Sequence, residues 1–200
     1  MTLWHHEPMD HAITLEGFGV RLVPLAPEHA ADLAALVDAE LWAGMTVAVP
    51  DTAEAMSAYV AAAIATPGRA AFAVLGAEAG AVRGSTSLYE WVPAQERVEL
   101  GSTFYARQFW GGLTNPACKF LLMRHAFEEA GINRLALRAY ARNTRSIAAI
   151  TRLGAVHEGV LREHRIALDG TRGDTVYFSI LAREWPAVRA GLLARLAAES

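Results

Sequence analysis

The amino-acid sequence predicts one α/β domain, of the α+β kind, around a mixed and mostly antiparallel sheet of about seven strands. Two observations predict it. Three strand-like segments follow one another through short connectors that suit hairpins, at 70–75, 81–89 and 97–105. The chain then alternates between strand and helix periods, with strands at 134–140, 155–161 and 176–180. The first series predicts an antiparallel meander, and the second adds strand-helix-strand units to it.

The remaining elements follow from start and stop signals along the chain. A first strand is expected at 20–25, after which Pro27 opens a helix that runs to about Val37. A second helix, at 52–65, begins behind Asp51 and ends at a Thr-Pro-Gly turn. Later helices are expected after Asn115 as far as Gly131, at 144–153, and at 184–198. No repeat or linker divides residues 1–200, and residues 1–14 are expected to form a flexible or loosely packed N-terminal extension.

Composition narrows the classes of function. Of the 200 residues, 53% are hydrophobic and 20% are charged, which is typical of a folded globular protein. The net charge of -3 argues against nucleic acid as a ligand, because binding a phosphate backbone usually needs a basic surface. No apolar run is long enough to cross a bilayer and no signal-peptide layout opens the chain, so we expect a cytoplasmic protein without a membrane partner.

Metal and disulfide chemistry find no support in the sequence. The single cysteine, Cys118, has no partner for a disulfide and no CxxC spacing, and we interpret it as a small apolar residue of a helix. No histidine pair has the spacing of a zinc-binding helix. We therefore expect no metal site.

The segment Trp110-Gly111-Gly112-Leu113-Thr114-Asn115 is the first candidate for a binding site. It joins the end of a strand to the start of a helix, where backbone N–H groups converge and the helix dipole adds partial positive charge. A diphosphate fits such a turn without a basic cluster. By itself, however, a Gly-Gly pair before a helix is more often a plain turn.

Further motifs make the pattern specific. They are Val98-Glu99-Leu100-Gly101, Asn143-x-x-Ser146, Leu153-Gly154-Ala155, Glu158-Gly159-Val160-Leu161-Arg162 and Asp174-Thr175-Val176-Tyr177-Phe178-Ser179-Ile180. With the glycine turn, they resemble the GNAT superfamily of N-acetyltransferases over nearly the whole chain, and in particular its RimJ/RimL branch of ribosomal-protein N-terminal acetyltransferases. The resemblance implies a sheet with helices on both faces and a transferase that moves an acetyl group from acetyl-CoA to a primary amine.

The resemblance also implies which residues bind acetyl-CoA. Backbone amides of the glycine turn would hold the pyrophosphate, and the pantetheine arm would lie along the end of the preceding strand. The implied set is Phe104, Tyr105, Gln108, Trp110, Gly111, Gly112, Leu113, Thr114, Asn115, Asn143 and Ser146. The acceptor would be a protein N-terminus or a small amine, and the chain a monomer or homodimer.

Two positions depart from the pattern of the family. Leu113 replaces the small residue that ends the family's glycine motif, so either the loop bends differently or coenzyme binding is weakened. Ile150 stands where many relatives carry a tyrosine acid. These departures leave a second reading open, in which the chain is a catalytically weak or inactive coenzyme-binding or regulatory module.

Asn143 and Ser146 lie three residues apart across a helix start, so both side chains face the same way. Asn143 suits the N-cap, which is a purely structural role. The resemblance instead implies that Asn143 contacts the pantetheine and that Ser146 protonates the departing thiolate. Both interpretations remain open.

Glu99 is the candidate for the base that an attacking amine needs. Strand alternation places Val98, Leu100 and Phe104 on one face and Glu99, with Tyr105, on the other. Glu99 is then either a general base acting through water or a structural partner of an arginine. The acceptor pocket is expected from loops 41–50 and 90–96, with further candidates at Trp42, Tyr89, Glu90, Trp91 and His164.

Overall fold

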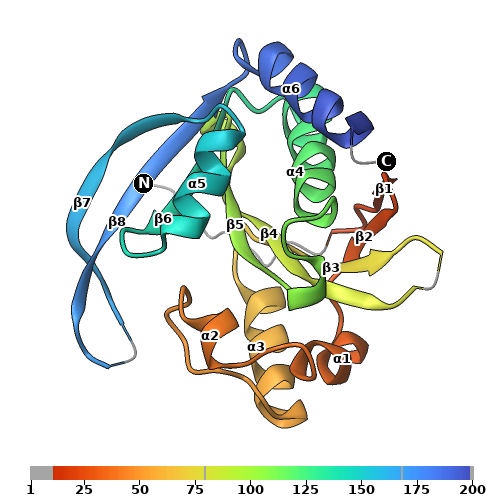
Figure 1. Ribbon diagram of the computed structural model, residues 1–200, viewed down its shortest axis with the longest axis vertical. Helices are drawn as coiled ribbons and strands as arrows, with labels where there is room; N and C mark the ends of the chain where they lie inside the picture. Colours follow the sequence, from red (N-terminus) through yellow and green to blue (C-terminus); the bar gives the residue numbers. More distant parts are fainter. Residues whose placement is uncertain (1–10, 79, 168, 199–200) are drawn as a thin grey trace.

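One eight-stranded sheet organises the computed structural model, which describes residues 11–78, 80–167 and 169–198 (Figure 1). The strand order is β1-β2-β3-β4-β5-β6-β8-β7, and every neighbouring pair is antiparallel except β5 and β6. The strands are β1 (Leu15–Gly17), β2 (Val20–Pro24), β3 (Ala70–Gly76), β4 (Val82–Val92), β5 (Arg97–Tyr105), β6 (Arg134–Tyr140), β7 (Val156–Ile166) and β8 (Arg172–Leu181).

Helices cover both faces of this sheet (Figure 1). The helices are α1 (Ala30–Ala34), α2 (Ala39–Trp42), α3 (Ala53–Ala65), α4 (Thr114–Arg124), α5 (Thr144–Arg152) and α6 (Trp185–Ala198). The short turns are η1 (Pro27–His29), η2 (Pro93–Gln95), η3 (Arg107–Phe109) and the π-helical η4 (His125–Glu129). Alternation along β3 divides the core, because Phe72 and Val74 pack with α4 whereas Ala71 and Ala73 pack with α1 and α3.

The predicted architecture is confirmed, with local differences. The strand β2, the meander of β3 to β5 and the helices α3, α5 and α6 follow the sequence signals, and Thr52 caps α3 by accepting from the N–H of Ala55 at 3.1 Å. The helix expected from Pro27 to Val37 is only η1 and α1. A separate helix, α2, begins where Asp38 accepts from the N–H of Leu41 at 2.8 Å. The strand β1 was not expected, because three residues carry too little periodicity.

A bulge in β5 overturns the predicted alternation of its side chains. Ser87 pairs with Gly101 and Ser85 with Phe104, so two residues of β5 stand opposite one residue of β4. Ser102 takes a φ of 47° there. Phe104 therefore packs with α3 rather than beside Val98, and Tyr105 joins the core of Val98 instead.

The parallel pair of β5 and β6 is short and opens a gap in the sheet. Its register covers only the pairs from Arg97 with Arg134 to Glu99 with Ala136. Beyond Glu99 the two strands separate, although β5 continues to Tyr105 and β6 to Tyr140. The splayed ends leave backbone and side chains of both strands available to a ligand.

The expected N-terminal extension falls mostly outside the described residues, which begin at His11. Within it, Nε2 of His11 donates to the carbonyl of Ala71 at 2.9 Å, and the His11 ring lies 4.6 Å from the ring of Phe72.

Among the described helices, none has the length and apolar character needed to cross a membrane.

Candidate active site

A cleft of about 720 Å³ occupies the gap between β5 and β6. It has lining residues on both faces of the sheet, so it is open to two sides. On the face of α4, α5 and α6 it is lined by Asn115, Lys119, Arg152 and Arg195. On the other face it is lined by Leu41 of α2, by 44–46 of the segment after α2, and by 164–166 of β7. Two substrates can thus approach the same centre from opposite sides.

The glycine turn forms one wall of this cleft. Gly111 has a φ of 78°, a left-handed conformation that favours glycine, and the helix α4 begins three residues later. The first N–H groups of a helix have no acceptor within the helix, so those of Thr114 and Asn115 remain for a ligand. Trp110 fixes the turn, since its Nε1 donates to the carbonyl of Tyr105 at 2.8 Å. The turn is therefore built to present backbone donors to an anion.

Eight of the eleven predicted coenzyme residues line the cleft: Phe104, Tyr105, Trp110, Gly111, Gly112, Asn115, Asn143 and Ser146. The other three do not. Gln108 is exposed, the side chain of Leu113 packs against the core, and Thr114 is buried and accepts from Arg83 at 3.3 Å. Leu113 is the position where the chain departs from the family's glycine motif. Because its side chain turns inward, the larger residue does not narrow the cleft.

Asn143 caps α5 and faces the cleft at the same time. Its Oδ1 accepts from the N–H of Ser146 at 3.0 Å, which is the capping geometry. A Cβ added to Gly44 would lie 2.8 Å from its Nδ2, so the segment after α2 runs directly against this side chain. Ser146 is half-buried and lines the cleft. The structural role of Asn143 is present, and it leaves the amide nitrogen free to face a second group.

Glu99 lies beside the cleft in an ion pair. Its carboxylate is buried, and Oε2 lies 3.3 Å from Nε of Arg138. Glu99 is not among the lining residues, but Tyr89, which is opposite it in the β4–β5 register, lines the cleft. Burial first, and the charge of Glu99 second, raise the pKa of the Tyr89 hydroxyl, which stays protonated at ordinary pH. Tyr89 is thus the group between the carboxylate and the cleft.

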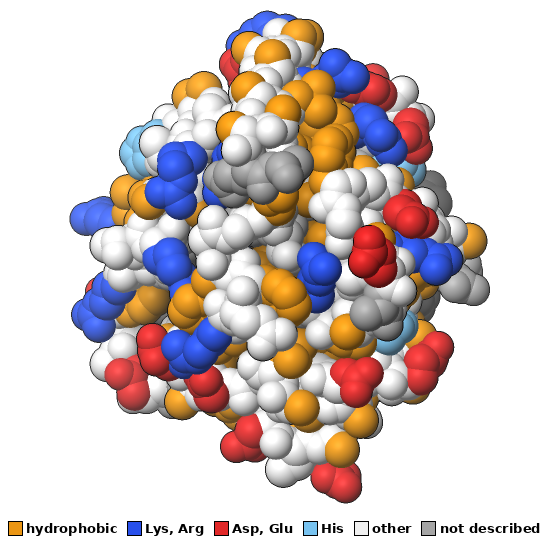
Figure 2. All heavy atoms as spheres, turned by 45° about the vertical axis from the view of Figure 1, so that its right-hand side comes forward, with side chains coloured by type: hydrophobic (Ala, Val, Ile, Leu, Met, Phe, Trp, Pro, Cys, Tyr) orange, Lys and Arg blue, Asp and Glu red, His pale blue; other side chains and the backbone are white. Residues whose placement is uncertain are grey.

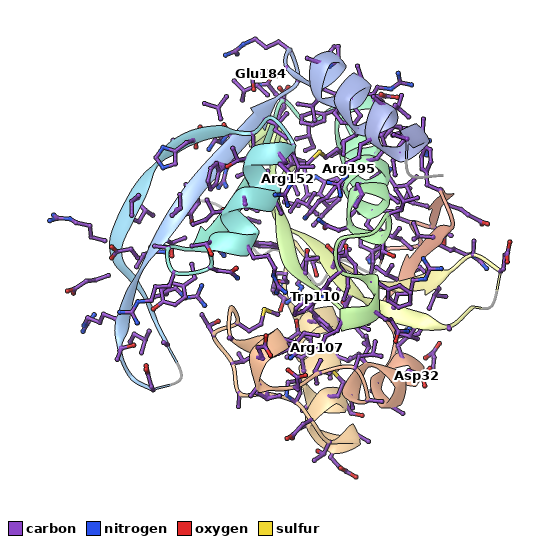
Figure 3. The ribbon with its side chains drawn as sticks, in the orientation of Figure 1. Asp32, Arg107, Trp110, Arg152, Glu184 and Arg195 are labelled. Atoms are coloured by element: carbon purple, nitrogen blue, oxygen red, sulfur yellow. The ribbon has the colours of Figure 1, made fainter. Side chains whose placement is uncertain are left out.

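Cations dominate the lining of the cleft. None of its lining residues within the described part of the chain is Asp or Glu. Six of them are Lys or Arg: Lys119, Arg138, Arg145, Arg152, Arg165 and Arg195. Figure 3 shows Arg152 and Arg195 reaching from α5 and α6 into the space between α5 and α4. Exposed acidic residues lie elsewhere, for example at the lower end of the molecule in Figure 2, over α1 and α3. The cleft is therefore positive although the chain carries a net charge of -3.

Sequence reasoning missed these cations. Arg145, Ala149 and Arg152 are spaced as one face of α5, and Asn115 and Lys119 as one face of α4, so helical spacing carried a signal. Burial lowers the pKa of Lys119 to about 8. Arg195, from a distant helix, could be placed only by the fold.

The remaining sequence candidates divide between core and cleft. Trp42 is fully buried in the core, and its Nε1 donates to the carbonyl of Val47 at 2.9 Å. Neither Glu90 nor Trp91 lines the cleft, whereas His164 does, with Nδ1 3.1 Å from Oγ1 of Thr175. Cys118 is buried, as expected of a core residue, and burial raises the pKa of its thiol to about 12. No cluster of three or more His, Cys, Asp or Glu residues able to hold a metal occurs in the described ranges.

A model of the acetyltransferase (GNAT) domain matches residues 20–156, which is more than half of the chain. The chain therefore belongs to the GNAT family of acetyltransferases, whose members use acetyl-CoA. Its sequence is 36% identical over 107 residues to the "Putative ribosomal N-acetyltransferase YdaF" of Bacillus subtilis, a match that covers 53% of this chain and 57% of that protein. Less than two thirds of the curated relative is thus spanned.

Solved structures agree with this assignment. A GCN5-related N-acetyltransferase from Brucella melitensis is 28% identical, with a TM-score of 0.87 over 96% of this chain and 89% of that one. RimJ of Mycobacterium smegmatis, solved in complex with CoA-disulfide, shares the fold at 20% identity, with a TM-score of 0.79 over 94% and 96% of the two chains. The likeness to YdaF supports the predicted RimJ/RimL-like branch, and the RimJ structure agrees with it in fold.

Proposed function

We propose that this chain is an acetyl-CoA-dependent N-acetyltransferase that acetylates a primary amine by direct attack. One observation carries the proposal: the cleft between β5 and β6 opens to both faces of the sheet, with a glycine turn and a helix start on one side and the segment after α2 on the other. A coenzyme that enters from the first side and an amine that enters from the second would meet at the splayed strands. Family membership supplies the identity of the coenzyme.

The chemistry of the cleft fits acetyl-CoA. The N–H groups of the turn would bind the pyrophosphate, and Lys119, Arg152 and Arg195 would lie near the remaining phosphate charge. The apolar ends of β5 and β6, with Phe104 and Leu137, would contact the pantetheine arm. A cleft with six cations and no carboxylate among its described lining residues is suited to a ligand that carries several phosphate charges.

Proton transfer is the second part of the proposal. An ammonium ion has no lone pair, so the amine must lose a proton before it attacks the thioester carbonyl. Glu99 would accept this proton through the Tyr89 hydroxyl or through water, since its own carboxylate does not line the cleft. Ser146, at the first turn of α5, would protonate the thiolate of CoA as it leaves.

For the acceptor, a protein N-terminus is the first choice and a small amine the second. The name of YdaF points to ribosomal protein, and a ribosomal acceptor would agree with a cytoplasmic location. The same fold hosts many acceptors, so this choice rests on likeness alone.

The proposal is tested by measuring thiol release from acetyl-CoA with a panel of peptides and small amines, and coenzyme binding by calorimetry. We expect binding, and thiol release with at least one amine. Glu99→Gln and Ser146→Ala should each lower kcat at least tenfold, whereas the exposed Glu163→Gln should leave kcat unchanged. Binding without thiol release would favour the regulatory module, and absence of binding would refute both readings.

A further inference from the structure

Two arginines, Arg138 of β6 and Arg165 of β7, line the cleft on the side away from the glycine turn. Both share the face of the segment after α2, because Nη2 of Arg165 donates to the carbonyl of Gly44 at 2.9 Å and Arg138 alternates with the core residue Leu137. The coenzyme phosphates are assigned to the opposite side in the proposed function. These two cations therefore need another explanation.

Arg165 carries an unbalanced charge. Its guanidinium lies over the ring of Tyr140 at 4.7 Å, and its Nε is buried without a hydrogen-bond partner. Within the described part of the chain, no carboxylate lies within ion-pair distance of it. Burial first, and the charge of Arg138 after it, lower the pKa of Arg165 against the opposing effect of Tyr140. A partly buried guanidinium without a counter-ion costs free energy, and the chain maintains it at the mouth of a cleft.

Arg138 does not share this excess. Its Nε pairs with Glu99 at 3.3 Å and its Nη1 donates to the hydroxyl of Tyr177 at 2.9 Å, so its charge is balanced. His164 is the remaining lining side chain on this side that can carry a positive charge, and its Nδ1 lies 3.1 Å from Oγ1 of Thr175. The net charge at this mouth is thus the single positive charge of Arg165.

We infer that the amine acceptor carries a carboxylate close to its amino group, and that Arg165 binds it. This inference rests on the proposed function. The planar fork of a guanidinium matches a carboxylate, and Tyr140 below it and Gly44 beside it hold its plane in place. Pairing with Arg165 also offsets the charge of the acceptor's own carboxylate, which would otherwise favour the ammonium form of the nearby amine. The carboxylate belongs either to a free amino acid or to an acidic side chain next to a peptide N-terminus.

Matched acceptor pairs test the inference. One pair is an amino acid and its amide, and the other is a peptide with Ser-Asp at its N-terminus and the same peptide with Ser-Asn. In the wild type, kcat/KM should be about 10- to 100-fold higher for the acidic member of at least one pair, the size expected for charge-assisted hydrogen bonds. The pair that shows the preference identifies the source of the carboxylate.

Substitution of Arg165 should remove this preference. Arg165→Gln should raise KM for the acidic member until the two members of a pair have equal kcat/KM. It should change kcat/KM of the neutral member less than threefold. Arg165→Lys should retain part of the preference, and Arg162→Gln, on the same strand and outside the cleft lining, should retain all of it. Equal rates within both pairs in the wild type, or an equal loss for both members in Arg165→Gln, would overturn the inference.

A direct binding measurement separates this inference from the proposed function. If no amine releases thiol, the proposed function fails. Equilibrium dialysis of the same four radiolabelled acceptors against the CoA-saturated protein then measures whether Arg165 still binds a carboxylate. Tighter binding of an acidic member, at least tenfold and lost in Arg165→Gln, would uphold the site. Equal binding of the members of each pair would refute it.

Discussion

The guanidinium of Arg145 lies over the ring of Trp110, with Cζ 3.6 Å from the ring centroid. Arg145 belongs to the first turn of α5 and Trp110 to the glycine turn, so this cation–π contact joins the two sides of the coenzyme mouth. Arg107 lies over the same ring at 5.1 Å and also binds Asp38, the N-cap of α2. The coenzyme turn, α5 and the segment near the acceptor are thus connected through one indole.

Trp110→Leu and Arg145→Ala should therefore weaken acetyl-CoA binding about 2- to 5-fold, because a cation–π contact of an exposed arginine contributes roughly 0.5–1 kcal/mol. Calorimetry measures the affinity, and thermal unfolding shows whether each variant is folded. Arg142→Ala is the matched control, since Arg142 lies three residues earlier and does not line the cleft. An Arg145→Ala affinity equal to that of Arg142→Ala would contradict the role of the contact.

The bulge at Ser102 gives a prediction about stability. A non-glycine residue at a φ of 47° carries a strain of about 1–2 kcal/mol. Ser102→Gly removes the strain but makes the unfolded chain more flexible, so we expect a small gain of roughly 0.5 kcal/mol in the free energy of unfolding. Ser102→Val should lose about 2 kcal/mol or more, because β-branched residues fit this conformation worst. Urea denaturation measures both, with Ser102→Ala as the control for loss of the hydroxyl.

The same bulge marks where sequence reasoning ended. Periodicity and caps predicted the meander, α3 and α5, because these depend on nearby residues. The alternation in β5 could not be read beyond Gly101, since an extra residue reverses it and Ser102 gives no local signal. The glycine turn was found from its own residues. Arg165 and Arg195 were missed, because strands and helices far apart in the chain bring them to the cleft.

Lys119 links coenzyme binding and stability to pH. Burial lowers its pKa from 10.5 to about 8, so between these values the unfolded chain holds more protons, and the free energy of unfolding rises with pH. Lys119→Met should be more stable than the wild type at pH 7, by at most about 3 kcal/mol, and this difference should shrink towards pH 10. Urea denaturation at several pH values measures it. A difference that does not change with pH would show that Lys119 is not a buried cation.

The affinity for acetyl-CoA should respond in the opposite direction. If the Lys119 ammonium binds a phosphate, wild-type affinity falls as pH rises through about 8, where the free side chain loses its charge. Lys119→Met should bind more weakly at pH 7 and show a flatter pH profile. Calorimetry at pH 7 and pH 9 checks both points, and parallel profiles for the two proteins would remove Lys119 from the coenzyme site.

The ion pair of Glu158 should make the free energy of unfolding depend on pH in the acid range. Glu158 binds Arg134, which pairs with Arg97 in the first of the β5–β6 pairs, and Ser179 donates to its Oε1 at 2.8 Å. The hydrogen bonds from Arg134, followed by the one from Ser179, lower the pKa of Glu158 to about 2 against the opposing effect of burial. Its stabilisation is therefore present above about pH 4.5 and is lost as pH falls towards 2.

Glu158→Gln should accordingly unfold more easily than the wild type at pH 7 and equally easily near pH 2. We expect a difference of about 1 kcal/mol at pH 7, because both side chains are one third exposed and water weakens the pair. Glu163→Gln is the control on the same strand, since Glu163 is exposed and lies 3.8 Å from Arg172. Urea denaturation between pH 2 and pH 7 gives the comparison. If Glu158→Gln and Glu163→Gln lost the same stability at every pH, the Glu158 ion pair would not be the source of this pH dependence.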